Sequence, residues 1–231
     1  MSDLIDTTEM YLKTIYELSE EGITPLRARI AERLGHSGPT VSQTVARMER
    51  DGLVVLAGDR HLELTEAGHL KAMRVMRKHR LAERLLIDVI GLEWPMAHDE
   101  ACRWEHVMSE RVEMRLTRLL EHPHYDPYGN PIPGLAEIGE HGTVPGFLEG
   151  VVSLVDPGAP TGGALAVVRR IGEPVQVDVE LLGRLAEAGI LPGAQVSVAR
   201  EDGLVTVGMP GSPDVLDLPD EVARHIFVAA M

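Results

Sequence analysis

Apolar residues in the first part of the chain recur every three or four positions, which is the spacing of one face of an amphipathic helix. The first such stripe ends at Gly22 and consists of Tyr11, Leu12, Ile15 and Leu18. A shorter helix is expected over residues 26–34, and Gly35-His36-Ser37 makes the turn that follows it. The spacing therefore predicts two helices that a short turn joins to a third.

The third helix has clear signals at both ends. Ser37 is placed to cap it, and Pro39 falls in its first turn, where the missing N–H leaves no helical hydrogen bond unmade. Gly52 ends it, and its inner face carries Val41, Val45 and Met48. Residues 53–56 and 60–64 then predict a hairpin around a Gly58-Asp59 turn. Three helices followed by a hairpin indicate a winged helix-turn-helix.

The second half of the chain changes from helical to strand-like patterns. A long helix is expected from Thr65, which can cap it, to residue 90, with Gly91 at its end, and two more over residues 96–107 and 110–120. Residues 134–163 are rich in Gly and Pro, which predicts a linker. Beyond it, a helix over residues 180–188 and apolar runs at 166–171, 175–179, 195–200, 204–207 and 225–228 are typical of a small β-barrel.

These elements predict a protein that is mainly α with some β, in four consecutive parts. A winged helix-turn-helix DNA-binding domain occupies residues 1–74, and a helical domain that carries the candidate metal ligands occupies residues 75–140. A flexible linker over residues 141–163 leads to the β-barrel domain at residues 164–231.

The net charge of −14 at pH 7 is unusual for a protein that binds nucleic acid. The charge is unevenly spread, however, because residues 27–50 hold five arginines against two glutamates. A local basic patch of this kind is what contact with DNA phosphates needs. The region from residue 150 onward is the most acidic third of the chain, so we expect a single DNA-reading head at the N-terminal end.

Three further features bear on the compartment. No apolar run approaches the ~18 residues of a membrane helix, so no membrane partner is expected. Met1-Ser2-Asp3 opens the chain without the basic stretch and apolar segment of a signal peptide. The single cysteine excludes an internal disulfide and fits a reducing environment. A cytoplasmic location is expected.

The segment Cys102-Arg103-Trp104-Glu105-His106 gathers a thiol, a carboxylate and an imidazole, and His98 precedes it. At helical spacing such groups share one face, which is how a metal site is assembled from few residues. His98 and His106 are eight residues apart, or ~12 Å along a helix, whereas metal ligands lie only ~2.0–2.3 Å from the ion. One ion cannot bind both histidines, so the spacing predicts two sites.

The natural division assigns Cys102, Glu105 and His106 to one site, and His98 with His79 and Glu83 of the long helix to the other. A mixture of thiolate, carboxylate and imidazole suits Fe(II), Co(II), Ni(II) or Zn(II) and is poor for Ca²⁺ or Mg²⁺.

Simpler interpretations stay open at this stage. His79 and Glu83 could form only a hydrogen bond within a helix interface, and Cys102 could be an inert buried thiol. A catalytic zinc site with Glu105 as general base is a further alternative. However, the chain has no His-Glu-x-x-His pairing, phosphate loop or Gly-rich cofactor turn. The winged helix with its basic patch favours a regulator over an enzyme, and a metal-storage protein is the third option.

Several long motifs point to one family. They are Asp6–Tyr11, Thr24–Leu34, Ser37–Val45, Met76–Arg84, the segment around Cys102, and Gly129–Leu135. Through them the chain resembles the diphtheria-toxin-repressor family of iron-dependent regulators, nearly end to end. Beyond Gly139 the match is one of pattern more than of sequence. The resemblance implies a helical dimerisation domain, with its interface around Glu100 and Trp104, and an SH3-like C-terminal barrel.

The resemblance also implies two sets of metal ligands. The regulatory site would consist of Met10, Cys102, Glu105 and His106, and the ancillary site of His79, Glu83, His98, Glu173 and Gln176. Pro174, between the last two, is a local difference from the family. Manganese-specific members typically carry acidic residues in place of Met10 and Cys102, so the softer pair present here indicates the iron branch.

For the DNA-reading helix, the resemblance implies that Ser37, Pro39 and Gln43 face base edges. Phosphates would be held by Arg27, Thr40, Ser42, Arg47, Arg50 and Arg60. The alternative is that several of these arginines only solvate helix faces or pair with Glu32 and Glu49.

The expected function is therefore that of a transcriptional repressor, not an enzyme, which Fe²⁺ activates at two sites per subunit. The metal would act as a co-repressor that promotes dimerisation and binding to palindromic operators of iron-homeostasis genes. Co²⁺, Ni²⁺, Zn²⁺ or Mn²⁺ would substitute in vitro. An ion that needs Met10 of the DNA-reading domain together with Cys102 of the helical domain would select one placement of the two reading heads.

Overall fold

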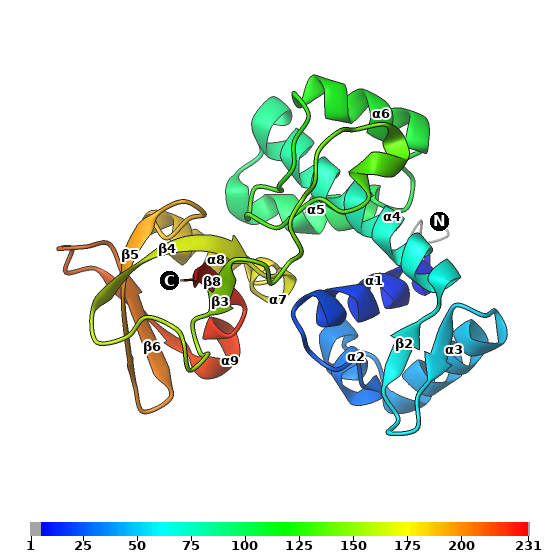
Figure 1. The fold of residues 1–231 in the computed structure, drawn as a ribbon, viewed down its shortest axis with the longest axis horizontal. Helices are drawn as coiled ribbons and strands as arrows, with labels where there is room; N and C mark the ends of the chain where they lie inside the picture. Colours follow the sequence, from blue (N-terminus) through cyan, green and yellow to red (C-terminus); the bar gives the residue numbers. More distant parts are fainter. Residues whose placement is uncertain (1–5, 231) are drawn as a thin grey trace. The chain divides into compact units, whose positions relative to one another are not determined.

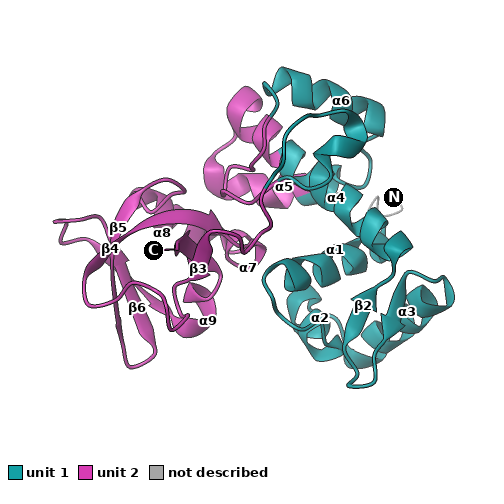
Figure 2. Ribbon diagram, viewed as in Figure 1, with its two compact units in different colours: residues 1–82, 102–122, 132–144 teal, residues 83–101, 123–131, 145–231 magenta. Residues whose placement is uncertain are grey.

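The computed structural model describes residues 6–230, so the Met1-Ser2-Asp3 stretch, from which no signal peptide is expected, lies outside the described residues. The chain forms two compact units (Figure 2). The first comprises residues 1–82, 102–122 and 132–144, and the second comprises residues 83–101, 123–131 and 145–231. Between residues 6 and 230, no helix combines the length and the apolar character that crossing a membrane requires.

The expected winged helix-turn-helix is present in the first unit (Figure 1). Its elements are α1 (Thr7–Glu20), α2 (Arg27–Leu34), α3 (Gly38–Arg50), β1 (Val54–Leu56) and β2 (Leu62–Leu64). The carboxylate of Asp6 caps α1 by accepting the N–H of Thr8 at 2.8 Å. Ser37 caps α3 as predicted, because its hydroxyl accepts the N–H of Thr40 at 3.4 Å. Local capping therefore defines where both helices start.

One apolar core holds these elements together. It consists of Tyr11, Leu12, Ile15, Leu18, Ile30, Val41, Val45, Met48, Val54, Leu62 and Ala72. The residues at three- and four-residue spacing that predicted α1 and α3 supply most of it. Since the inner face of α3 is taken up by this core, its opposite face is left to solvent.

The long helix also begins and ends as expected. The hydroxyl of Thr65 accepts the N–H of Gly68 at 3.1 Å, and α4 then runs over Glu66–Arg84. The helix continues in a wider π-helical turn over Leu85–Ile90, and Gly91 ends it with a φ of 79°.

The remaining helices of this region are short. They are a 3₁₀ turn at Trp94–Met96, α5 (Ala97–Trp104), α6 (Glu110–Leu119) and a 3₁₀ turn at Leu135–Ile138. The prediction that α5 reaches residue 107 is wrong. The carbonyl of Trp104 accepts the N–H groups of both Val107 and Met108, at 3.1 and 3.2 Å, as the chain turns toward α6. Glu105 and His106 therefore lie in this turn and not on the helix.

The second unit contains a six-stranded antiparallel sheet with the strand order β3-β8-β4-β5-β6-β7 (Figure 1). The strands are β3 (Val151–Ser153), β4 (Ala164–Ile171), β5 (Gln195–Glu201), β6 (Leu204–Gly208), β7 (Val215–Pro219) and β8 (Ile226–Ala229). Three helices, α7 (Glu173–Gln176), α8 (Val179–Glu187) and α9 (Asp220–Ala223), connect them. Inward-facing residues such as Val168, Val196 and Val205 are fully buried in one core.

The structure corrects the sequence-based prediction in this unit. Residues 175–179 form no strand, because Pro174 lies in the first turn of the short helix α7 and α8 begins at Val179. Val151–Ser153, which was placed in the flexible linker, is strand β3 and pairs with β8. β7 was missed altogether and pairs with β6.

Candidate metal centre and DNA-reading surface

The side chain of Glu105 lies at the centre of a buried polar cluster in the first unit. Its Oε2 accepts a hydrogen bond from Nζ of Lys13 at 2.8 Å and lies 2.6 Å from Nδ1 of His79. Its Oε1 lies 3.3 Å from Nε2 of His106. Since only 2% of Glu105 is exposed, a carboxylate, two imidazoles and an ammonium group meet where little water reaches.

Cys102 borders this cluster. The Sγ atom of Cys102, which is in no disulfide, lies 3.7 Å from Nζ of Lys13. Met10 is half-buried on α1, three residues before Lys13, and packs against the core of the winged helix. His106, which belongs to the cluster, also contacts α1, because its Nδ1 lies 2.9 Å from Oε2 of Glu9. The cluster therefore joins α1 to the turn that follows α5.

The electrostatics of the cluster keep Glu105 ionised. Burial raises the pKa of this carboxyl group, but the charge of Lys13 and the hydrogen bond from His79 outweigh burial and lower the pKa to about 2. Glu105 is therefore an anion at neutral pH, which is the form that binds a metal ion.

Two features of this cluster were not predicted from the sequence. His79, which the spacing argument assigned to the other site, also contacts Glu105. Lys13 was not among the predicted site residues at all. Its position three residues after Met10, on the same side of α1, is the signal that could have identified it.

A second cluster of ligand-type side chains lies in the second unit. Nδ1 of His98 is 3.2 Å from Oε1 of Glu83 and 3.5 Å from Oε2 of Glu173. All three side chains are buried, and their potential ligand atoms lie within 4.8 Å of one another. Glu83 comes from the end of α4, His98 from α5 and Glu173 from α7. His79, the remaining histidine of the predicted ancillary set, precedes Glu83 by one turn of α4.

The side-chain amide oxygen of Gln176 is a further potential metal ligand in the second unit. Because α7 is a helix, Gln176 follows Glu173 by nearly one turn, on the same side. Its Nε2 donates to the carbonyl oxygen of Ile171 at 2.7 Å, and the whole side chain is buried. Its Oε1 is buried as well and has no hydrogen-bond partner among residues 6–230.

This unpartnered oxygen tests whether the residues fit a metal ion. A buried acceptor without a donor costs about 1–3 kcal/mol, so it is rare unless something else fills its lone pairs. An amide oxygen together with buried carboxylates and an imidazole is a suitable ligand set for a divalent transition metal, and Gln176 lies on the same side of α7 as Glu173. The donor set of the second unit therefore fits a metal ion, as does the sulfur-, nitrogen- and oxygen-containing set around Glu105.

The predicted DNA contacts gather on the outer side of the winged helix. Ser37, Pro39, Thr40, Ser42, Gln43, Arg47, Arg50 and Arg60 are exposed, and Arg27 is half-buried. Arg60 lies in the turn of the hairpin with a φ of 69°. Within the described part of the chain, neither Arg47 nor Arg50 makes an ion pair, whereas Arg33 pairs with Glu17 at 3.4 Å. Arg47 and Arg50 are therefore not paired with Glu32 or Glu49 in this structure.

An apolar surface lies at the end of the long helix and the start of α5. Val89, Ile90 and Met96 are each about half exposed, at 51%, 55% and 45%. Large exposed apolar side chains are typical of a protein contact surface where they form one patch. Glu100 and Trp104, the two predicted interface residues, are half-buried on α5.

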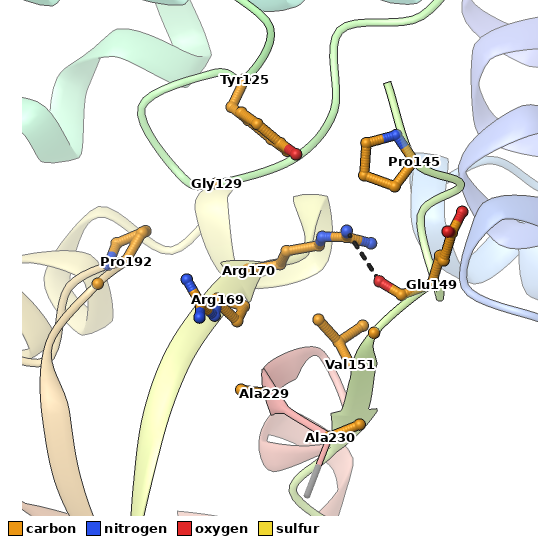
Figure 3. Close-up of a pocket in the computed structure, with 12 residues that line it drawn as sticks. Tyr125, Gly129, Pro145, Glu149, Val151, Arg169, Arg170, Pro192, Ala229 and Ala230 are labelled. Carbon is orange, nitrogen blue, oxygen red and sulfur yellow. Dashed lines mark hydrogen bonds between the residues drawn. The ribbon is translucent and has the colours of Figure 1, made fainter. Parts of the chain in front are cut away.

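A cavity of about 510 Å³ in the second unit lies apart from these clusters (Figure 3). Tyr125 and Gly129 line it on one side, and Arg169 and Arg170 of β4 on another. The guanidinium of Arg170 donates to the carbonyl oxygens of Gly146 and Glu149, at 3.1 and 3.3 Å. None of the predicted metal ligands lines this cavity.

An exposed recognition helix, together with buried imidazoles and carboxylates and a half-buried thiol, defines a metal-responsive DNA-binding protein. Comparison with known families agrees. Residues 3–62 match the iron-dependent repressor N-terminal DNA-binding domain, and residues 65–134 match the iron-dependent repressor metal-binding and dimerisation domain. Residues 159–230 match the FeoA domain, in agreement with the SH3-like barrel that was expected at this end.

The similarity to known proteins and structures covers nearly the full chain. The sequence is 59% identical to the iron-dependent repressor IdeR of Mycobacterium tuberculosis and 52% identical to the diphtheria toxin repressor of Corynebacterium diphtheriae, in both cases over 99% of each chain. A manganese-dependent transcriptional repressor in complex with manganese has a TM-score of 0.80 at 30% identity, covering 97% of this chain and 100% of the other. The chain belongs to the diphtheria-toxin-repressor family.

This family consists of metal-dependent transcriptional repressors and not of enzymes, as the sequence predicted. The partners of the protein are accordingly operator DNA and a second copy of the chain.

Proposed function

We propose that Fe²⁺ is the ion that activates this repressor, and that each subunit has two sites for it. The observation that carries the proposal is the donor set around Glu105, where a thiol accompanies a carboxylate and an imidazole. Met10, three residues before Lys13 on α1, would add a thioether to this set. Sulfur donors favour iron and later transition metals over Mn²⁺. Co²⁺, Ni²⁺, Zn²⁺ and Mn²⁺ are expected to replace Fe²⁺ in vitro.

The regulatory ion would be held by Met10, Cys102, Glu105 and His106. The ancillary ion would be held by His79, Glu83, His98, Glu173 and Gln176. The buried Oε1 of Gln176 and the close approach of His98 to Glu83 and Glu173 support the second assignment.

The regulatory ligands provide the link to DNA binding. A divalent ion supplies the positive charge that draws thioether, thiolate, carboxylate and imidazole together. Met10 lies on α1, and α1 also supplies Tyr11, Leu12 and Ile15 to the core that supports α3. Holding Met10 beside Glu105 and His106 therefore restricts the reading head, and binding would favour the arrangement that fits DNA.

At the operator, α3 would enter the major groove with Ser37, Pro39 and Gln43 at base edges. Arg27, Thr40, Ser42, Arg47, Arg50 and Arg60 would contact phosphates, which sets the register without reading sequence. Two copies joined through Glu100, Trp104 and the apolar side chains nearby would match a palindrome. The regulated genes would be those of iron homeostasis, and the protein would act in the cytoplasm.

Fluorescence anisotropy under anoxic conditions tests this function. A labelled palindromic operator of the family type would be titrated with protein in Fe²⁺ or Co²⁺, with a chelator control and a scrambled duplex. We expect tight binding only to the operator and only with metal. Metal binding without any gain in DNA affinity would contradict the proposal and indicate a storage protein.

A further inference from the structure

The ammonium group of Lys13 is surrounded by proposed metal ligands, all within the first unit. Its Nζ lies 2.8 Å from Oε2 of Glu105, 3.0 Å from Nδ1 of His79 and 3.7 Å from Sγ of Cys102. Only 5% of the residue is exposed. A buried ammonium group is stable only where anions and hydrogen-bond acceptors surround it, so this position depends on these partners.

Glu105 and Cys102 offer the same lone pairs to Lys13 that they would offer to a metal ion. A carboxylate oxygen or a sulfur atom that accepts an N–H bond from Lys13 cannot direct that lone pair to an ion at the same time. An ammonium group beside Glu105 and Cys102 would also repel a divalent cation there. Lys13 in its present position therefore disfavours an ion bound to Glu105.

We propose that Lys13 is an internal cation that competes with the metal for Glu105 and Cys102, and so sets the metal concentration at which the repressor responds. The inference rests on the proposed function of this cluster as the regulatory site. A site that is partly occupied by its own side chain binds with an affinity reduced by the fraction of molecules in which it is open.

Glu17 provides the position to which the ammonium group moves. It follows Lys13 by one turn of α1, and its Oε1 lies 3.9 Å from Nζ. A small rotation of the flexible lysine side chain toward Glu17 keeps the charge paired while Glu105 is released. Arg33 pairs with the other oxygen of Glu17, at 3.4 Å, so this carboxylate is held in place.

The test is anoxic calorimetry of the full-length protein with Co²⁺, accompanied by the absorbance of the Co²⁺–thiolate bond at Cys102. Lys13→Leu removes the ammonium group and introduces no ligand atom. We expect it to bind Co²⁺ at the thiolate site more tightly by roughly tenfold. Because the affinity for Co²⁺ is higher, the metal-induced rise in Tm should also be larger in this variant. Lys78→Leu is the matched control, since Lys78 is half-buried and has no ion pair among residues 6–230, and its affinity should not change.

Glu17→Gln tests the same idea in the opposite direction. Without the carboxylate of Glu17, Lys13 stays with Glu105, so the Co²⁺ affinity should fall by several-fold. In a Lys13→Leu background the same substitution should have no effect. This second variant decides the question if Lys13→Leu does not fold.

Equal or weaker Co²⁺ binding by folded Lys13→Leu, or unchanged binding by Glu17→Gln, would overturn the competition. Neither result depends on DNA, whereas the proposed function fails only if the wild-type protein gains no operator affinity with metal. The two failures are therefore distinguishable.

Discussion

The guanidinium of Arg77 donates to the carboxylate of Glu113 at 2.6 Å, and both side chains are almost fully buried. Arg77 lies on α4 and Glu113 on α6. A second nitrogen of Arg77 donates to the carbonyl oxygen of Gly134 and to Glu137, at 2.7 and 3.0 Å. One buried side chain thus connects three separate segments of the first unit.

Arg77→Met should therefore destabilise the protein strongly. The substitution leaves the buried carboxylate of Glu113 without its partner, a loss of about 3–5 kcal/mol in other buried pairs. Urea unfolding of the metal-free protein measures this loss in the free energy of unfolding. Arg74→Met is the control, because Arg74 pairs with Glu137 at the surface, where such pairs contribute only about 0–1 kcal/mol. Equal losses for the two variants would refute this account of Arg77.

Gly129 should tolerate no side chain. A Cβ atom there would overlap the carbonyl oxygen of Arg169, and the residue has a φ of 84°. Gly139→Ala separates the two causes, because Gly139 has a φ of 83° but no described atom within 4 Å of its Cβ position. Gly139→Ala should cost only the ~1–2 kcal/mol of left-handed backbone. Gly129→Ala should lower the Tm clearly more, and similar Tm values would disprove the close approach.

Cys102→Ala should abolish metal-dependent operator binding while leaving the fold intact. It removes the only thiol, which is not in a disulfide, and so deletes one proposed ligand of the regulatory ion. Circular dichroism checks the fold, and anisotropy with Fe²⁺ checks the response. A normal response to Fe²⁺ would exclude Cys102 from the regulatory site.

Gln43→Ala should change operator preference more than overall affinity. Gln43 is exposed on the solvent face of α3, where its amide can form hydrogen bonds to a base edge, and each such contact contributes about 1–3 kcal/mol of discrimination. Arg47→Ala is the comparison: it should weaken binding to all duplexes and reduce the salt dependence. Competition binding with single-base operator variants measures both. An equal loss of affinity on random DNA would remove Gln43 from base reading.

Gln176→Leu should weaken metal binding at the ancillary site by at least about tenfold, since its Oε1 is the proposed ligand. The stability of the metal-free protein should change little. The variant loses one bond to Ile171, whose carbonyl oxygen still accepts from Asn130 at 3.0 Å, but it also removes a buried unpartnered oxygen. Gln176→Glu keeps an oxygen ligand and should keep the affinity. Calorimetry that finds unchanged affinity in Gln176→Leu would exclude this residue.

Local sequence signals were sufficient for the winged helix-turn-helix and the long helix. Helix ends depend on nearby groups, such as the hydroxyl of Ser37 at the start of α3 or the left-handed Gly91 after the long helix. The apolar spacing within α1 and α3 likewise identified their buried faces. These features involve residues within a few positions of one another, so the sequence by itself determined them.

Tertiary structure decided the rest. β3 and β7 are short, and only their pairing with β8 and β6 makes them strands. The contacts of Lys13 with His79 and Glu105 join residues separated by 66 and 92 positions, and no local rule predicts them. Spacing along the chain shows which groups share a helix face. The packing of α1 against the later helices determines that His79 and Glu105 surround the ammonium group of Lys13.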